Sequence, residues 1–147
     1  EYEKKGKVIV SDGTTNIHPV WAPDGKQFAY LSNKDHDGFG QTDLFIYSFI
    51  DSTTNKIAGG VKTAPTWIDD STIVFTRHSK PNKWGSKYFD LYRYTFSNEE
   101  EHRMTYGSRM ISPVYNKDLN SIVSISTFDG TSNVMISKNV DIFSDLS

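Results

Sequence analysis

The stretch Pro19-Val20-Trp21-Ala22-Pro23-Asp24-Gly25 decides the fold, because its first three residues recur along the chain at nearly constant spacing. The matching segments start at Pro65, 46 residues further on, and at Pro113, 48 residues beyond that. A glycine precedes each copy by five or six residues, at Gly13, Gly60 and Gly107. Self-similarity with a period of this length indicates a repeat architecture.

Each repeat is predicted to form four short antiparallel strands. Ala22-Pro23-Asp24-Gly25 is typical of a tight hairpin turn, since proline does not continue a ladder and Asp-Gly tolerates positive φ. The first repeat then gives strands at 17–21, 26–32, 43–49 and 56–58. The fourth strand of the second repeat is predicted at 103–105, and the second strand of the third repeat at 121–126. No stretch shows sustained helical periodicity. The fold class is therefore all-β, with β-propeller blades of four antiparallel strands at about 14–58, 61–106 and 108–136.

The recurring aromatic residues are expected in the core between blades. Trp21, Trp67 and Tyr115 occupy equivalent positions in the three copies. A residue that recurs in every copy serves the repeat itself, so these three are not candidates for a ligand site.

The strand register leaves one strand without its own blade at the start of the chain, and a last blade without its fourth strand at the end. Residues 7–11, chiefly Val8–Ser11, are predicted as a fourth-type strand that belongs to an adjacent blade, and the last repeat ends after its third strand at 133–136. Three blades do not close a ring, because propellers have about four to eight. The chain is thus expected to be a partial propeller. It is either a piece of a longer chain, which the absence of Met at position 1 favours, or half of a head-to-tail homodimer.

The first repeat resembles the WD-like Pro-Asp propeller repeat of TolB-type proteins, whose pattern is roughly P-x-W-S-P-D-G-K-x-I-A-F-x-S followed by D-I/L-Y. The resembling segments are Pro19–Ser32 and Asp43–Tyr47; in the third copy Tyr115 replaces Trp and Asn133 replaces Asp. The resemblance implies a six-bladed ring, which two copies of this chain would complete. It also implies a non-catalytic binding or scaffold module in the periplasm or envelope of a bacterium, with protein partners.

Composition excludes several classes of protein. The net charge is −2 with scattered basic residues, so nucleic acid is not an expected partner. No apolar run approaches the length of a membrane-spanning helix, so the chain is not expected to span a membrane. There is no cysteine, which removes disulfides and thiolate chemistry and leaves the cytoplasm open as an alternative location to the periplasm.

One loop face is predicted to carry the binding site, because loops on a rigid scaffold are free to vary. It combines the loops between second and third strands with the segments that lead from one blade to the next. The acidic loop 33–42 and the basic, aromatic loop 78–89 would meet a protein or a polar ligand there. The predicted contact residues are Asp35, Asp37, His78, Lys83, Trp84 and Arg109, with no catalytic residue and no cofactor.

Two alternatives remain open. Asp35, Asp37 and Asp43 resemble the start of a calcium loop, although Ile46 stands where the closing Glu would be and Asp43 also fits a structural role in the repeat. The second alternative is an enzyme. A lyase or hydrolase site at the channel mouth would use His18 and His78 with a carboxylate or a metal, and a prolyl-oligopeptidase-like peptidase would carry its catalytic residues in a separate domain.

Overall fold

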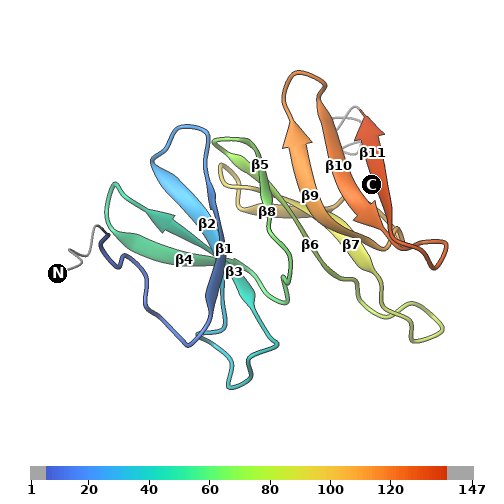
Figure 1. Ribbon diagram of the computed structural model, residues 1–147, viewed down its shortest axis with the longest axis horizontal. Coiled ribbons are helices and arrows are strands. Elements are labelled where there is room, and N and C mark those ends of the chain that lie inside the picture. The colour runs from blue at the N-terminus through green and yellow to red at the C-terminus, as the bar shows by residue number, and fades with distance from the viewer. Residues whose placement is uncertain (1–5, 139–147) are drawn as a thin grey trace.

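The computed structural model describes residues 6–138, which form eleven strands in three antiparallel sheets. The sheets follow one another in chain order and pack face to face, as blades of a propeller do (Figure 1). No helix occurs between residues 6 and 138. The prediction of an all-β partial propeller is confirmed.

Two sheets are complete and the third has three strands in the described part of the chain. The first sheet consists of β1 (Asn16–Trp21), β2 (Gln27–Ser32), β3 (Asp43–Ser48) and β4 (Thr53–Ala58). The second consists of β5 (Thr66–Asp69), β6 (Thr72–His78), β7 (Phe89–Thr95) and β8 (Glu100–Arg103). The third consists of β9 (Met110–Asn116), β10 (Ser121–Ser126) and β11 (Asn133–Lys138).

In blades 1 and 3, the proline of the repeat lies at a bulge in the first strand. The register of β1 against β2 shifts between Ile17 and Val20, and that of β9 against β10 shifts between Ile111 and Val114. The residues in front of these prolines, His18 and Ser112, have φ of 54° and 53°. Proline has no N–H for the ladder, so a bulge is where a sheet accepts it.

The core lies between the sheets. The side of blade 1 that carries Ala29, Leu31 and Leu44 packs against the side of blade 2 that carries Trp67 and other aromatic residues. The indole Nε1 of Trp67 donates to the backbone oxygen of Val20 at 3.1 Å. A second cluster joins blade 2 to blade 3 through Val74, Leu91, Met104, Met110 and Ile122, with Tyr115 at its border.

Trp21 differs from its counterparts, which corrects the expectation that all three recurring aromatic residues are core. Trp67 is 6% exposed, whereas Trp21 is 60% exposed. The two rings have the same local surroundings: Trp21 stacks on Phe49 and Trp67 on Phe96, both with an interplanar angle of 15°. Trp21 therefore occupies an interblade position with no described blade in front of it.

Residues 7–11 form no strand within this chain, and the fourth-type strand predicted for them would have to pair with an adjacent blade. A strand needs a ladder partner, and this segment has none in the described part of the chain. Ile9 instead lies with Pro19, Trp21 and Phe49 around a small apolar hollow of about 250 Å³. The assignment of the segment to an adjacent blade stays a prediction.

The fourth strands were placed too late in the sequence. β4 begins at Thr53, directly after the turn at Asp51-Ser52, rather than at Lys56. β8 ends at Arg103, where the prediction had it begin. The hydroxyl of Thr105 accepts a bond from the Leu91 amide, so a side chain replaces the ladder there.

Candidate functional site

The connecting loops reach one side of the molecule, as predicted. The β2–β3 and β6–β7 loops extend from the same edge of the sheets, at the lower side of Figure 1, while the turns at 22–25 and 117–120 lie at the opposite edge. This loop face is where the structure places the predicted contact residues.

A buried aspartate anchors the segment that enters blade 3. The carboxylate of Asp90 accepts bonds from the amides of Gly107 at 3.1 Å and Ser108 at 2.9 Å, and Arg103 donates to it at 2.6 Å. Burial alone would raise the pKa of Asp90, but these donors outweigh it and hold the pKa below its usual value. The charged carboxylate thus fixes the path between blades at the loop face.

Asp43 serves the same purpose at the entrance to blade 2. It accepts the Gly60 amide at 2.9 Å, the Lys56 ammonium at 2.6 Å and a bond with the His36 ring at 2.9 Å. Burial raises the pKa of Asp43, and the bonds from Lys56, Gly60 and His36 lower it further than burial raises it. Asp43 is therefore the structural aspartate of its repeat.

The alternative of a calcium site would use Asp43 as one of its ligands. The carboxylate of Asp43 is already bonded by Lys56, which also pairs with Asp35 at 3.3 Å, and Asp37 is exposed. Between residues 6 and 138, no group of three or more His, Asp or Glu side chains is placed to hold a metal ion. Calcium binding by this loop stays a prediction.

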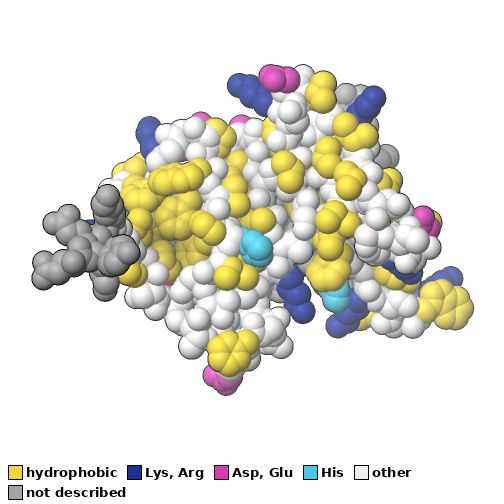
Figure 2. All heavy atoms as spheres, in the orientation of Figure 1, with side chains coloured by type: hydrophobic (Ala, Val, Ile, Leu, Met, Phe, Trp, Pro, Cys, Tyr) yellow, Lys and Arg dark blue, Asp and Glu magenta, His cyan; other side chains and the backbone are white. Residues whose placement is uncertain are grey.

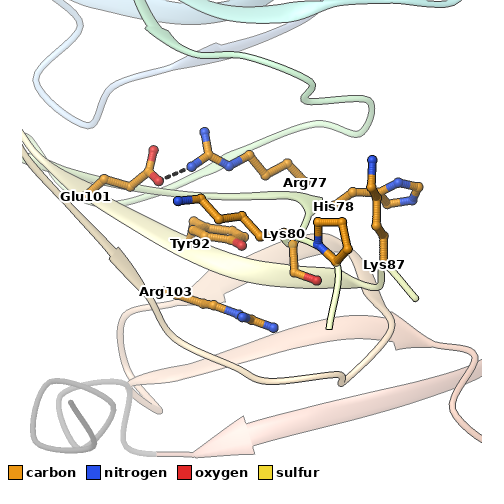
Figure 3. Close-up of a pocket in the computed structure, with 9 residues that line it drawn as sticks. Arg77, His78, Lys80, Lys87, Tyr92, Glu101 and Arg103 are labelled. Carbon is orange, nitrogen blue, oxygen red and sulfur yellow. Dashed lines mark hydrogen bonds and ion pairs between the residues drawn. The ribbon is translucent and has the colours of Figure 1, made fainter. Parts of the chain in front are cut away.

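Two adjoining clefts open beside blade 2. The larger, of about 610 Å³, follows β6, β7 and β8, and the side chains that line it are drawn in Figure 3. Its lining consists of Arg77, His78, Ser79, Lys80, Pro81, Lys87, Tyr92, Glu101 and Arg103. The smaller, of about 390 Å³, lies towards blade 1 and includes His36 and Lys62. Because Arg77, His78 and Lys87 line both, we treat the two as one site, the basic cleft.

The basic cleft carries a strong excess of positive charge. In the larger part, Arg77, Lys80, Lys87 and Arg103 stand against the single carboxylate of Glu101. Arg77 forms an ion pair with Glu101, and its guanidinium lies 4.7 Å from the centre of the Tyr92 ring. A chain with net charge −2 thus concentrates cations at one concave place.

Three cations of the basic cleft are available to a ligand. Lys62, Lys80 and Lys87 have no carboxylate within 4.0 Å among residues 6–138, whereas Arg77 and Arg103 are paired. The paired arginines are fixed in place, and Lys80 and Lys87 extend from the walls around them (Figure 3). Such an arrangement attracts an anionic group and offers rigid and adaptable donors together.

Known proteins share this architecture. No family model matches the sequence. The Tol-Pal system protein TolB of Ruthia magnifica subsp. Calyptogena magnifica is 30% identical over 93 residues, which cover 60% of this chain and 20% of that protein. The crystal structure of TolB from Acinetobacter baumannii superposes with a TM-score of 0.73 at 20% identity, over 92% of this chain and 32% of that one. The chain has a TolB-like β-propeller fold. It spans about a fifth of the length of the curated relative and about a third of the solved TolB chain.

Enzymes share the TolB-like propeller too. An oligogalacturonate lyase solved in complex with manganese superposes with a TM-score of 0.60 at 16% identity, over 95% of this chain and 39% of that one. Likeness of fold does not choose between binding and catalysis. In this propeller His18 is exposed on β1 and lines neither part of the basic cleft, while His78 lines both.

Of the predicted contact residues, His78 alone lines the basic cleft; its ring packs on Phe89 with the centroids 3.9 Å apart. Trp84 lies at the tip of the β6–β7 loop, 79% exposed, with the Lys83 ammonium 5.0 Å from its ring centre. Arg109 lies 4.8 Å from the ring centre of Tyr88. Asp35 and Asp37 remain on the β2–β3 loop, outside both parts of the cleft.

The sequence pointed to the loop 78–89, which contributes Ser79, Lys80, Pro81 and Lys87, but not to the strand residues that complete the cleft. Arg77 belongs to β6 and Glu101 to β8. A signal was present in the repeat itself. By strand register, Arg77 stands opposite Asp90 as Ser32 stands opposite Asp43 and Ser126 opposite Asn133. An arginine where the other copies have serine is a departure from the repeat.

Proposed function

We propose that this chain is a non-catalytic binding module of TolB-like type, whose basic cleft holds an acidic segment of a partner protein. The observation that carries the proposal is the concave surface with four cations and one carboxylate in a chain of net charge −2. A segment of Asp and Glu residues would meet Lys62, Lys80 and Lys87, and its backbone would lie along the wall formed by Pro81 and Tyr92. Tyr92 in that wall belongs to β7, so this part of the wall needs little ordering on binding.

The proposed setting is the bacterial periplasm or cell envelope, with protein partners. The support is the name of the curated relative, a component of a Tol-Pal system. Between residues 6 and 138 there is no helix long and apolar enough to cross a membrane. A second copy of the chain is proposed as a further partner, which would complete a six-bladed ring.

The test uses a fluorescently labelled peptide of alternating Glu and Gly residues and measures its anisotropy on titration with the chain. We expect saturable binding that weakens as salt is added, because the cleft is open to solvent. The double variant Lys80→Glu, Lys87→Glu should weaken binding by about tenfold or more. The double variant Lys26→Glu, Lys117→Glu, in the turns at the opposite edge of the sheets, changes the net charge by the same amount and is the matched control.

Equal loss of binding in the cleft variant and in the double variant Lys26→Glu, Lys117→Glu would contradict the proposal, because net charge alone would then explain the loss. The alternative ligand is an acidic saccharide, and a soluble polygalacturonate titrated in competition with the peptide tests it. If it displaces the peptide and binds more tightly per acidic group, the site takes an acidic saccharide and not a protein segment.

A further inference from the structure

The two outer faces of the chain are unlike each other. The outer face of blade 1 is rich in aromatic rings, and we call the following set its aromatic face: Trp21, Phe28, Tyr30, Phe45, Tyr47 and Phe49. The outer face of blade 3 has branched aliphatic side chains, and we call the following set its aliphatic face: Ile111, Val114, Val123, Ile125, Val134 and Ile136. Figure 2 shows the aromatic face as a broad hydrophobic area over the first sheet, with further hydrophobic side chains over β9–β11.

The aromatic face repeats the surface of blade 2 that is buried against blade 1. Trp21 pairs with Phe28 in the register of blade 1 as Trp67 pairs with Ile73 in blade 2. The cross-strand ring pair Tyr30 and Phe45 likewise corresponds to Phe75 and Tyr92, each pair stacked. Trp21, which is 60% exposed, thus occupies a position that is interface in blade 2, whereas Tyr30 and Phe45 are already buried within the chain.

The aliphatic face repeats the surface of blade 1 that covers blade 2. In β10, Val123 stands opposite Val114 and Ile136, as Ala29 in β2 stands opposite Val20 and Ile46. Ala29 is fully buried in the interface, whereas Val123 is 36% exposed and Val134 is 77% exposed. The matched sets are Ile111 with Ile17, Val114 with Val20, Val123 with Ala29, Ile125 with Leu31, Val134 with Leu44 and Ile136 with Ile46.

We infer that the aromatic face of one copy receives the aliphatic face of a second copy, so that two chains close one ring of six blades through two equal interfaces. The inference rests on the proposed pairing of two copies and adds the surfaces that form it. By the equivalence with Trp67, the indole of Trp21 would donate to the backbone oxygen of Val114 in the other copy, as Trp67 donates to Val20 within the chain.

Closure of the ring favours a pair of copies over a filament of many copies. The contact is head-to-tail, and such contacts give rings when the rotation closes and open filaments when it does not. Once one interface has formed, the second forms within the same assembly at high effective concentration. Three blades from each copy give a number within the range of known propellers.

The experiment measures mass by light scattering coupled to size exclusion, over a range of protein concentrations. The wild-type chain is expected at twice its own mass. Trp21→Glu and Val123→Glu should each give the mass of one chain, because each damages both interfaces of a pair. Trp84→Glu is the control, since it replaces a tryptophan outside both faces that is 79% exposed, against 60% for Trp21.

Mixing the two variants separates a head-to-tail contact from any other. A copy with Trp21→Glu keeps its aliphatic face, and a copy with Val123→Glu keeps its aromatic face, so one interface is intact in the mixed pair. We expect the mixture to recover a species of two chains, weaker than the wild-type pair. A contact of like faces would not recover.

The inference is overturned by a wild-type chain at single mass, by pairs that survive both variants, by a ladder of larger species, or by a mixture that stays at single mass. If a variant loses its β-sheet circular dichroism, Phe49→Glu or Val134→Glu takes its place. The substituted residues lie away from the basic cleft. Peptide binding by the single-mass variants therefore reports on the proposed ligand separately from the pairing.

Discussion

The repeat provides its own matched pair of mutations, at Trp67 and Trp21. Trp67→Ala removes a side chain that is 6% exposed, together with the bond from its Nε1 to Val20. Replacing a buried Trp with Ala costs about 3–5 kcal/mol. Trp21 is 60% exposed, so it has lost about 40% of its surface to contacts against about 94% for Trp67. Scaled by area, Trp21→Ala should cost about 1.5–2 kcal/mol in a single chain.

Urea unfolding followed by circular dichroism measures both values. The chain should be dilute enough to remain unpaired, because pairing would add a concentration-dependent contribution to the wild type. The ratio of the two losses is the informative quantity, since the local ring stack is the same at both sites. Equal losses in the unpaired chain would refute the reasoning, because they would mean that the blade 1–blade 2 interface contributes nothing beyond that stack.

Three further predictions concern Asp90, Gly60 and the loop that contains Asp37. Folding lowers the pKa of Asp90, so the stability that its carboxylate contributes is present above the unfolded pKa near 3.8 and is lost as pH falls through the folded pKa. The thermal midpoint of Asp90→Asn should therefore be lower than that of the wild type at neutral pH. It should also fall less steeply than the wild-type midpoint as the pH is lowered. Gly60→Ala should lower the free energy of unfolding by about 1 kcal/mol, because φ is 71° there, while Gly38→Ala, without positive φ, should change little. Calcium added after EGTA treatment should leave the thermal midpoint unchanged if Asp43 is only structural, and a rise that Asp37→Asn abolishes would assign the loop a metal.

Repetition made the fold predictable from sequence. Three weak signals at one spacing, the proline, the aromatic residue and the glycine, reinforced one another, and the strands β2, β3 and β10 were placed to within a residue at each end. The errors came where the context differs from an ordinary strand. β8 ends early because the Thr105 hydroxyl, and not a backbone carbonyl, accepts the bond from the Leu91 amide.

The candidate site was less predictable because its loop residues are completed by strand residues of blade 2, which meet them only in three dimensions. Glu101 and Arg77 are 24 residues apart and form an ion pair across β6 and β8. The loop 78–89 was singled out for its charge and aromatic content, and its tip at Trp84 projects away from the scaffold, whereas its base at His78 and Lys87 lines the cleft. The composition of the loop 78–89 indicated the region of the basic cleft, and the strand register of the repeats pointed to Arg77.

The comparison of copies yields a last prediction, at Arg77. Positions that the copies share hold blades together, so a position where one copy departs from the others is free to serve a ligand. Arg77→Ser restores the residue found at Ser32 and Ser126, and the side chains of Arg77 and Glu101 are both partly exposed, so the free energy of unfolding should fall by less than about 1 kcal/mol. Affinity for the acidic peptide should nevertheless fall severalfold, because the fixed cation of the basic cleft is lost. Peptide titration and urea unfolding of the same preparation decide the matter: a variant that binds as wild type but unfolds easily would make Arg77 a structural residue of blade 2, and would leave the lysines alone to attract the ligand.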